Sequence, residues 1–154
     1  MWQYRYFFVA GIGTGGTSGA GKYLKEKTAS ENRRSRSRRF GILRLFQNRE
    51  LPEPHVYAVE GIGEDYLVKV VDFNTINEII QVNDHDSFEM ARRLSREEGI
   101  FAGGSSGSAV LAAVRYAEKN DKEQNIVVVL PDSGSRYLSK IFNDEWMKNR
   151  GYID

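Results

Sequence analysis

Residues 9–17 read Val-Ala-Gly-Ile-Gly-Thr-Gly-Gly-Thr, a glycine-rich stretch around which the rest of the chain can be interpreted. It follows an aromatic and apolar run at 4–10, which predicts a buried strand, and it precedes a predicted helix over 18–27. Its glycines fit G-x-G-x-x-G, the spacing of dinucleotide-binding loops. Arginines occupy the region where an NAD-binding protein would carry an acid, so an NADP-binding Rossmann module stays open.

The same glycines fit two kinds of phosphate site. Residues 16–23 fall one residue short of a P-loop, because Tyr23 stands where a small hydroxyl would bind magnesium, and this disfavours a nucleoside triphosphatase. Residues 13–17 instead offer successive backbone N–H groups, two threonine hydroxyls and a helix N-terminus, which together would hold a phosphate monoester. A tight turn that packs helix on strand and binds nothing is the alternative for an isolated motif.

Strand, glycine- or serine-rich loop and helix alternate three times along the chain. A Gly/Ser loop at 103–108 leads into a predicted helix at 109–119. The β-branched run 126–130, typical of a strand covered on both faces, leads through the loop 131–134 into a predicted helix at 137–147. This order predicts an α/β fold with an open, mainly parallel twisted sheet and flanking helices. Because ligands bind beyond the carboxyl ends of such strands, the three loops should converge at one edge.

Three shorter patterns complete the predicted elements. Residues 60–63, Glu-Gly-Ile-Gly, predict a loop, and residues 79–82 predict a short strand. Residues 86–89, Asp-Ser-Phe-Glu, have the form of a capping box with Asp86 as the N-cap of a helix. Gly99 provides the C-terminal stop of that helix.

The composition excludes several kinds of site. A chain of 154 residues with 40% hydrophobic and 28% charged residues suits one ordinary domain or half of a larger one. The absence of cysteine removes disulfides, thiolate nucleophiles and cysteine-based zinc sites, and two histidines, His55 and His85, leave little basis for a metal site. The longest apolar run, 126–130, is too short to cross a bilayer, and no signal peptide is apparent, so we expect a cytoplasmic protein.

A net charge of +1 conceals an uneven distribution. Residues 28–49 hold seven arginines, no lysine and one acid, which sum to +6 and leave −5 for the rest of the chain. A solvated loop is the favoured interpretation of this segment. RNA binding through its arginines and translation from a shifted reading frame are the alternatives that we weigh.

Four motifs, in this order, resemble the cysteine synthase and cystathionine β-synthase family, which are pyridoxal-phosphate enzymes of fold type II. They are residues 9–17, residues 60–63, residues 99–107 (Gly-Ile-Phe-Ala-Gly-Gly-Ser-Ser-Gly) and residues 129–133 (Val-Leu-Pro-Asp-Ser). The resemblance implies that residues 1–154 are a partial enzyme domain, the C-terminal part of the family's fold. Residues 28–49 depart from the family pattern.

The resemblance assigns the cofactor's contacts to two of these motifs. It implies that the phosphate of pyridoxal 5′-phosphate is held, without a covalent bond, by Gly13, Thr14, Gly15, Gly16 and Thr17. Ser105 matches the serine that hydrogen-bonds the pyridine nitrogen, and a neutral hydroxyl there suits β-elimination and β-replacement. Capping of a helix N-terminus is the alternative role of Ser105.

The other two motifs match positions near the substrate and the ring. Gly61, Ile62 and Gly63 would lie beside the amino acid substrate, where glycines let the backbone approach closely. Asp132 and Ser133 would lie near the cofactor ring, or would simply cap the last helix.

The family's reaction joins an activated serine derivative to a thiol or sulfide, and it requires a lysine that forms a Schiff base with the cofactor. None of the eight lysines lies in the Ser-x-Lys-Asp-like setting of that residue, and a Thr-Ser-Gly-Asn-type loop for the substrate carboxylate is also missing. The resemblance therefore implies no catalytic residue in this chain, which we expect to be inactive alone. It further implies a homodimer for the intact enzyme, and allows a separate chain as the source of the N-terminal half.

Overall fold

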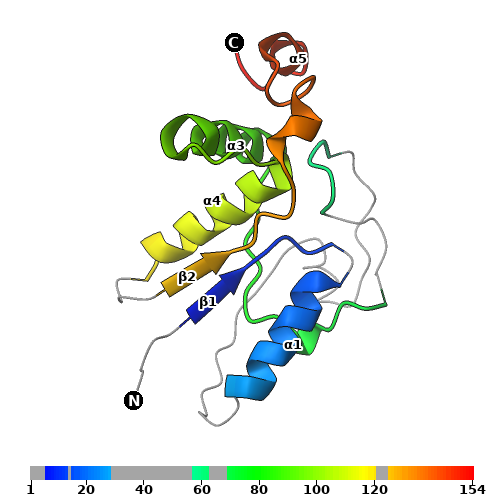
Figure 1. The fold of residues 1–154 in the computed structure, drawn as a ribbon, viewed down its shortest axis with the longest axis vertical. Helices are drawn as coiled ribbons and strands as arrows, with labels where there is room; N and C mark the ends of the chain where they lie inside the picture. The colour runs from blue at the N-terminus through cyan, green and yellow to red at the C-terminus, as the bar shows by residue number, and fades with distance from the viewer. Residues whose placement is uncertain (1–5, 14, 29–56, 63–68, 121–124) are drawn as a thin grey trace. The chain divides into compact units, whose positions relative to one another are not determined.

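A computed structural model of the chain describes residues 6–13, 15–28, 57–62, 69–120 and 125–154 (Figure 1). The predictions for Thr14, Gly63 and the arginine-rich segment after residue 28 lie outside these residues. The chain divides into two compact units. The sheet unit comprises residues 1–11, 57–60 and 82–154, and the helix–loop unit comprises residues 12–56 and 61–81.

Two of the predicted strands form a parallel pair in the sheet unit. Strand β1 (Tyr6–Val9) pairs with β2 (Asn125–Val128), with Tyr6 opposite Asn125 and Val9 opposite Val128. The parallel pairing and the helices beside it confirm the predicted α/β class. The expectation that residues 126–130 are covered on both faces is wrong, since Val127 is 49% exposed. Only two strands form this sheet in the described part of the chain, and along β2 exposed residues alternate with half-buried ones.

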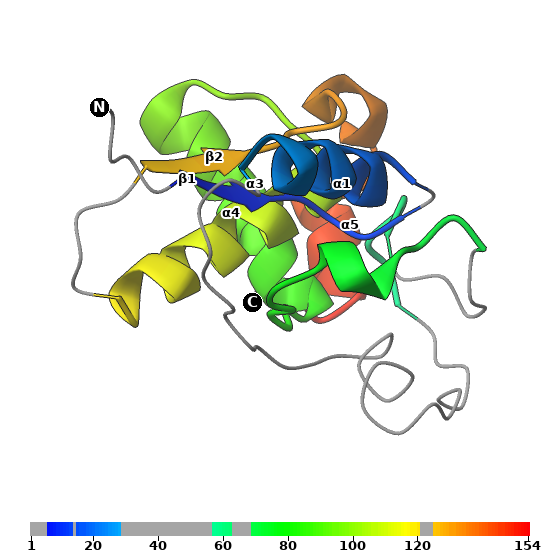
Figure 2. The same ribbon diagram turned by 90° about the horizontal axis from the view of Figure 1, so that it is seen from below.

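Helices α3 (Asp84–Glu98) and α4 (Gly104–Glu118) build the core of the sheet unit. Helix α4 packs against both strands, and α3 packs against α4 (Figures 1 and 2). Phe88, Ala91 and Leu94 recur at helical spacing on α3 and are all buried, as their pattern predicts. Gly107 lets the two helices approach closely, because a Cβ atom there would lie 2.0 Å from the Ser87 carbonyl oxygen.

The first helix boundary in this core differs from its prediction. Asn83, not Asp86, is the N-cap of α3, and its side-chain oxygen accepts the N–H of Asp86 at 2.8 Å. The pattern at 86–89 resembles a capping box, but the asparagine three residues earlier already satisfies that N–H. The predicted stop is confirmed, since Gly99 is the C-cap with φ +69°.

Helix α4 begins five residues before its predicted start at 109. Glycine and serine have low helix propensity, so the stretch 103–108 favours a loop on local grounds. Packing overrides that preference because the helix needs small residues where it touches α3. A Cβ atom at Gly104 would lie 3.0 Å from the Phe88 ring. Gly103 is the N-cap, so the alternative role of Ser105 as a cap is wrong.

The predicted helix at 137–147 is also wrong. A 3-10 helix, η2 (Gly134–Tyr137), is followed by turns and then by a separate short helix, α5 (Asp144–Asn149). Asn143 ends any continuous helix, because its side chain accepts the Trp146 N–H at 2.9 Å and starts α5 anew. This arrangement places Trp146 and Tyr152 against Phe88, with ring centroids 6.0 and 4.9 Å away.

The helix–loop unit contains α1 (Gly16–Thr28) and the 3-10 helix η1 (Phe73–Thr75). The hydroxyl of Ser18, on α1, accepts the N–H of Asp72 at 3.1 Å and ties the two elements together. Residues 79–82 form no strand, because they find no partner strand among the described residues, so that prediction is wrong. Across the described ranges, no helix is long and apolar enough to cross a membrane.

Candidate functional site

The glycine loop ends at the N-terminus of α1, which begins two residues earlier than predicted. The first N–H groups of a helix have no partner within it, and they carry partial positive charge. No acid lies in the first turn of α1, and Lys25 and Lys27 lie in its last turn. Gly16 is exposed, and a Cβ atom there would meet nothing within 4 Å. The first turn is therefore open at Gly16, and its partial positive charge suits an anion.

The turn at Gly61 lies against this glycine loop. A Cβ atom at Gly13 would come within 2.8 Å of the Gly61 carbonyl oxygen, so the two backbones meet at a distance that only glycine allows. Gly61 itself adopts φ +83°, in the left-handed region. The helix–loop unit thus brings the predicted phosphate residues Gly13, Gly15, Gly16 and Thr17 together with Gly61 and Ile62 of the predicted substrate turn.

In the sheet unit, the loops before α4 and after β2 meet. Ala102 and Ser133 form an antiparallel bridge, and the Gly134 N–H donates to the Phe101 carbonyl at 3.0 Å. The predicted convergence of loops is confirmed for this pair. Ser105 lies in the first turn of α4 and is 4% exposed.

Asp132 and Ser133 have different roles here. Ser133 caps η2, because its hydroxyl accepts the Ser135 N–H at 3.3 Å. Asp132 accepts the Tyr137 hydroxyl at 2.5 Å through Oδ2, while Oδ1 is buried and has no hydrogen-bond partner among the described residues. Oδ1 lies close to the start of α4, because a Cβ atom at Gly103 would come within 2.3 Å of it. A buried acceptor without a donor leaves room for a ligand's hydrogen bond.

Burial raises the pKa of Tyr137 to about 12, and its hydrogen bond to Asp132 adds to the shift. Tyr137 is 8% exposed, so its neutral form is favoured in the folded protein. The sequence does not indicate this residue, because only the turn from η2 back toward Asp132 brings the phenol to the carboxylate.

We expect the alkaline stability of the chain to depend on Tyr137. The pKa of Tyr137 in the folded chain, about 12, exceeds the usual 10.0. The stabilisation that Tyr137 contributes to the folded state is therefore complete below pH 10 and is lost as pH rises toward 12. A shift of this size corresponds to about 2–3 kcal/mol. Urea unfolding gives the free energy of unfolding at pH 8 and at pH 11. Its decrease between these pH values should be smaller for Tyr137→Phe than for the unchanged chain. Tyr23→Phe, at an exposed tyrosine, is the control, and equal losses in all three proteins would contradict this assignment.

Comparison with known proteins identifies the family. The model of the family described as pyridoxal-phosphate dependent enzymes matches residues 3–132. The chain belongs to this family. It is 39% identical over 148 residues to cystathionine beta-synthase of Apis mellifera, and 40% identical over 150 residues to that of Saccharomyces cerevisiae. These matches cover 96% and 95% of this chain but 29% and 30% of the relatives.

A cysteine synthase of Buchnera aphidicola is 34% identical over 150 residues, which cover 94% of this chain and 47% of that protein. The chain thus spans about three-tenths of the cystathionine beta-synthases and about half of the cysteine synthase. Within the helix–loop unit, the first turn of α1 is free of acids and open at Gly16, which fits the phosphate of pyridoxal phosphate.

Proposed function

We propose that this chain forms part of a pyridoxal-phosphate enzyme of sulfur amino acid metabolism, of the cystathionine β-synthase or cysteine synthase type, with β-replacement or β-elimination as its reaction. The observation that carries the proposal is the N-terminus of α1, which is free of acids and open at Gly16, and which follows a glycine loop whose Gly13 lies against Gly61. The family match favours this function over the NADP-binding alternative.

The glycine loop would hold the cofactor's phosphate through Gly13, Gly15, Gly16 and Thr17, with Thr14 completing the loop in the sequence. When bound, the cofactor supplies an electron sink for the bonds at the substrate's α-carbon. The peptide N–H groups of the loop would donate hydrogen bonds to the phosphate, so the site would hold the anion without a charged side chain.

Ser105 would hydrogen-bond the pyridine nitrogen. Its hydroxyl is neutral and held in the first turn of α4, so it would leave the ring unprotonated, which suits the milder chemistry of β-elimination. Asp132 and Ser133 would lie near the ring. The Tyr137 hydroxyl orients the Asp132 carboxylate and leaves Oδ1 as an acceptor for a further donor.

Gly61, Ile62 and Gly63 would lie beside the amino acid substrate. The positive φ of Gly61 and the absence of a side chain turn the backbone sharply there, and the peptide groups of the turn can then bind or shield the substrate. The contact of Gly61 with Gly13 supports this assignment, because it joins the substrate turn to the phosphate loop.

We further propose that the Schiff-base lysine comes from outside these 154 residues. None of the lysines, at 22, 25, 27, 69, 119, 122, 140 and 148, lies in the family's motif. The chain alone would therefore bind the cofactor non-covalently and would not complete the reaction. An N-terminal half, on this or a second polypeptide, and a homodimeric assembly are the partners that we propose.

The phosphate role of the α1 N-terminus can be tested by Gly16→Asp. A Cβ atom at Gly16 meets nothing within 4 Å, so the aspartate fits, and its charge would repel a phosphate in the first turn. Because like charges at short range are worth about 1–4 kcal/mol, we expect affinity for pyridoxal phosphate to fall by about tenfold or more. Equilibrium dialysis of the full chain measures this.

Gly19→Asp is the matched control. Gly19 is equally open and exposed, and it lies on the same helix three residues further from the loop. We expect a markedly smaller loss of affinity there. Equal losses for both variants would show a general charge effect and would refute the assignment of the phosphate to the first turn of α1.

A further inference from the structure

Residues 57–60 lead into the substrate turn, and they belong to no strand or helix in the described part of the chain. The peptide N–H groups of Ala58 and Val59 therefore have no ladder of backbone acceptors in the described ranges. Buried or half-buried N–H groups need acceptors from elsewhere. Ala58 is half-buried and Val59 is buried, so both require such a partner.

The carboxylate of Asp84 supplies both acceptors. Oδ2 accepts the Ala58 N–H at 2.7 Å, and Oδ1 accepts the Val59 N–H at 3.2 Å, although Asp84 follows these residues by more than 20 positions. Hydrogen bonds to a charged acceptor are stronger than those between neutral groups. Both oxygens of one side chain are engaged, so the two successive peptide groups are fixed in orientation as well as in position.

Asp84 is itself well placed to act as an anchor. It is the first residue of α3, where the helix dipole favours a negative charge, and Asn83 caps the same turn. Helix α3 carries the buried Phe88 and Ala91 and is fixed by its packing against α4. The carboxylate thus fixes residues 58 and 59 to a helix that is itself held by its packing in the core.

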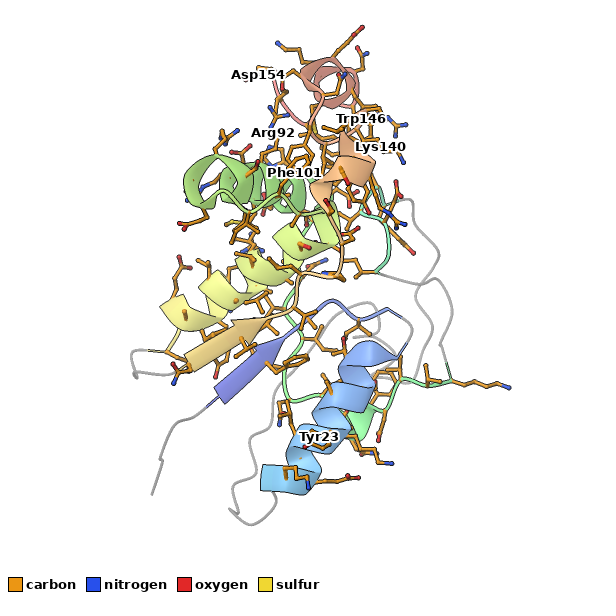
Figure 3. The ribbon with its side chains drawn as sticks, viewed as in Figure 1. Tyr23, Arg92, Phe101, Lys140, Trp146 and Asp154 are labelled. Atoms are coloured by element: carbon orange, nitrogen blue, oxygen red, sulfur yellow. The ribbon has the colours of Figure 1, made fainter. Side chains whose placement is uncertain are left out.

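The neighbouring groups support the same segment. The Val59 side chain packs toward the start of α4, since a Cβ atom at Gly104 would lie 3.8 Å from Val59 Cγ1. Glu60 forms an ion pair with Lys140, which extends from the turn between η2 and α5 (Figure 3). That pair is exposed and adds little on its own, whereas the bonds to Asp84 are half-buried.

We propose that Asp84 is a positioning residue for the substrate turn: it holds the peptide groups of Ala58 and Val59 so that the chain enters the turn at Gly61 in one conformation. This inference rests on the proposed function, in which Gly61 and Ile62 lie beside the amino acid substrate.

The test compares Asp84→Asn, Asp84→Ala and the control Asp86→Asn in the full chain. Asp86 lies in the same first turn of α3, but its carboxylate pairs with the side chains of His85 and Arg115. Two-dimensional NMR gives the exchange rates of the Ala58 and Val59 amide protons, and the resonances of Gly61 and Ile62.

Alanine at position 84 removes both acceptors, so both amides should exchange about tenfold faster or more. Asparagine at position 84 retains one carbonyl oxygen as an acceptor. In Asp84→Asn, therefore, only one of the Ala58 and Val59 amide protons should exchange faster. The Gly61 resonance should shift in both variants. Asp86→Asn should leave all of these unchanged. If Asp84→Ala fails to fold, the Asp84→Asn variant tests the proposal, through the difference between the exchange rates of its Ala58 and Val59 amide protons.

Uniform acceleration in the Asp84→Asn and Asp86→Asn variants would show a global loss of stability and would overturn the proposal. Faster exchange of Ala58 and Val59 with an unmoved Gly61 resonance would overturn it as well, since the turn would not depend on the anchor. Failure of the proposed function is detected separately, by the absence of pyridoxal phosphate binding to the unchanged chain.

Discussion

Gly107→Ala should strongly lower the free energy of unfolding of the sheet unit. The new Cβ atom would lie 2.0 Å from the Ser87 carbonyl oxygen and 2.8 Å from the Ala91 nitrogen. Both are backbone atoms of α3, so no side chain can rotate away, and the two helices must separate. Overpacking of a core typically costs 1–3 kcal/mol, and with backbone on both sides we expect about 3 kcal/mol or more.

Urea unfolding followed by circular dichroism measures this loss. Gly19→Ala is the control, because it adds the same methyl group to a helix where nothing lies within 4 Å. The control should leave stability unchanged or raise it by up to about 1 kcal/mol, since alanine has the higher helix propensity. A Gly107→Ala protein as stable as the control would show that the helices do not meet at this point.

Phe88→Ala should cost about 3–5 kcal/mol of the free energy of unfolding, because deleting a buried aromatic ring leaves a cavity. Phe88 is 2% exposed and lies at the centre of the core. Its ring meets the rings of Trp146 and Tyr152 edge-on and lies against Gly104. Its loss would therefore loosen α5, the C-terminal residues and the start of α4 together.

Phe101→Ala is the matched control for this prediction. Phe101 is 39% exposed, so the same deletion removes less buried surface, and we expect a loss well below that of Phe88→Ala. Thermal or urea unfolding of both variants gives the comparison. Equal losses would contradict the assignment of Phe88 to the centre of the core.

Sequence patterns predicted the elements whose signals are local. The strand before the glycine loop, helix α1, the buried face of α3 and the stop at Gly99 all follow from periodicity and from glycine chemistry. The wrong predictions concern elements decided by tertiary contacts. Helix α4 begins in a Gly/Ser stretch because α3 requires small residues there, and the last helix is divided by the cap at Asn143.

The candidate site shows the same division. The contact between Gly13 and Gly61 involves residues that the sequence singles out, because glycine is the residue that lets two backbones approach closely, and their roles toward a ligand stay predictions. The sequence does not single out Asp84 and Tyr137, because no spacing rule relates a carboxylate to peptide groups more than 20 residues away or a phenol to a neighbouring turn. Such residues emerge only when the fold brings them to their partners.

We propose that this chain carries a phosphate site for pyridoxal phosphate but no Schiff-base lysine. Equilibrium dialysis of the unchanged full chain against pyridoxal phosphate and against pyridoxal, followed by borohydride reduction and mass spectrometry, tests it most directly. We expect saturable binding of pyridoxal phosphate, affinity for pyridoxal that is lower by about tenfold or more, and no single lysine modified stoichiometrically. Equal binding of the two compounds, or stoichiometric attachment to one lysine, would contradict it.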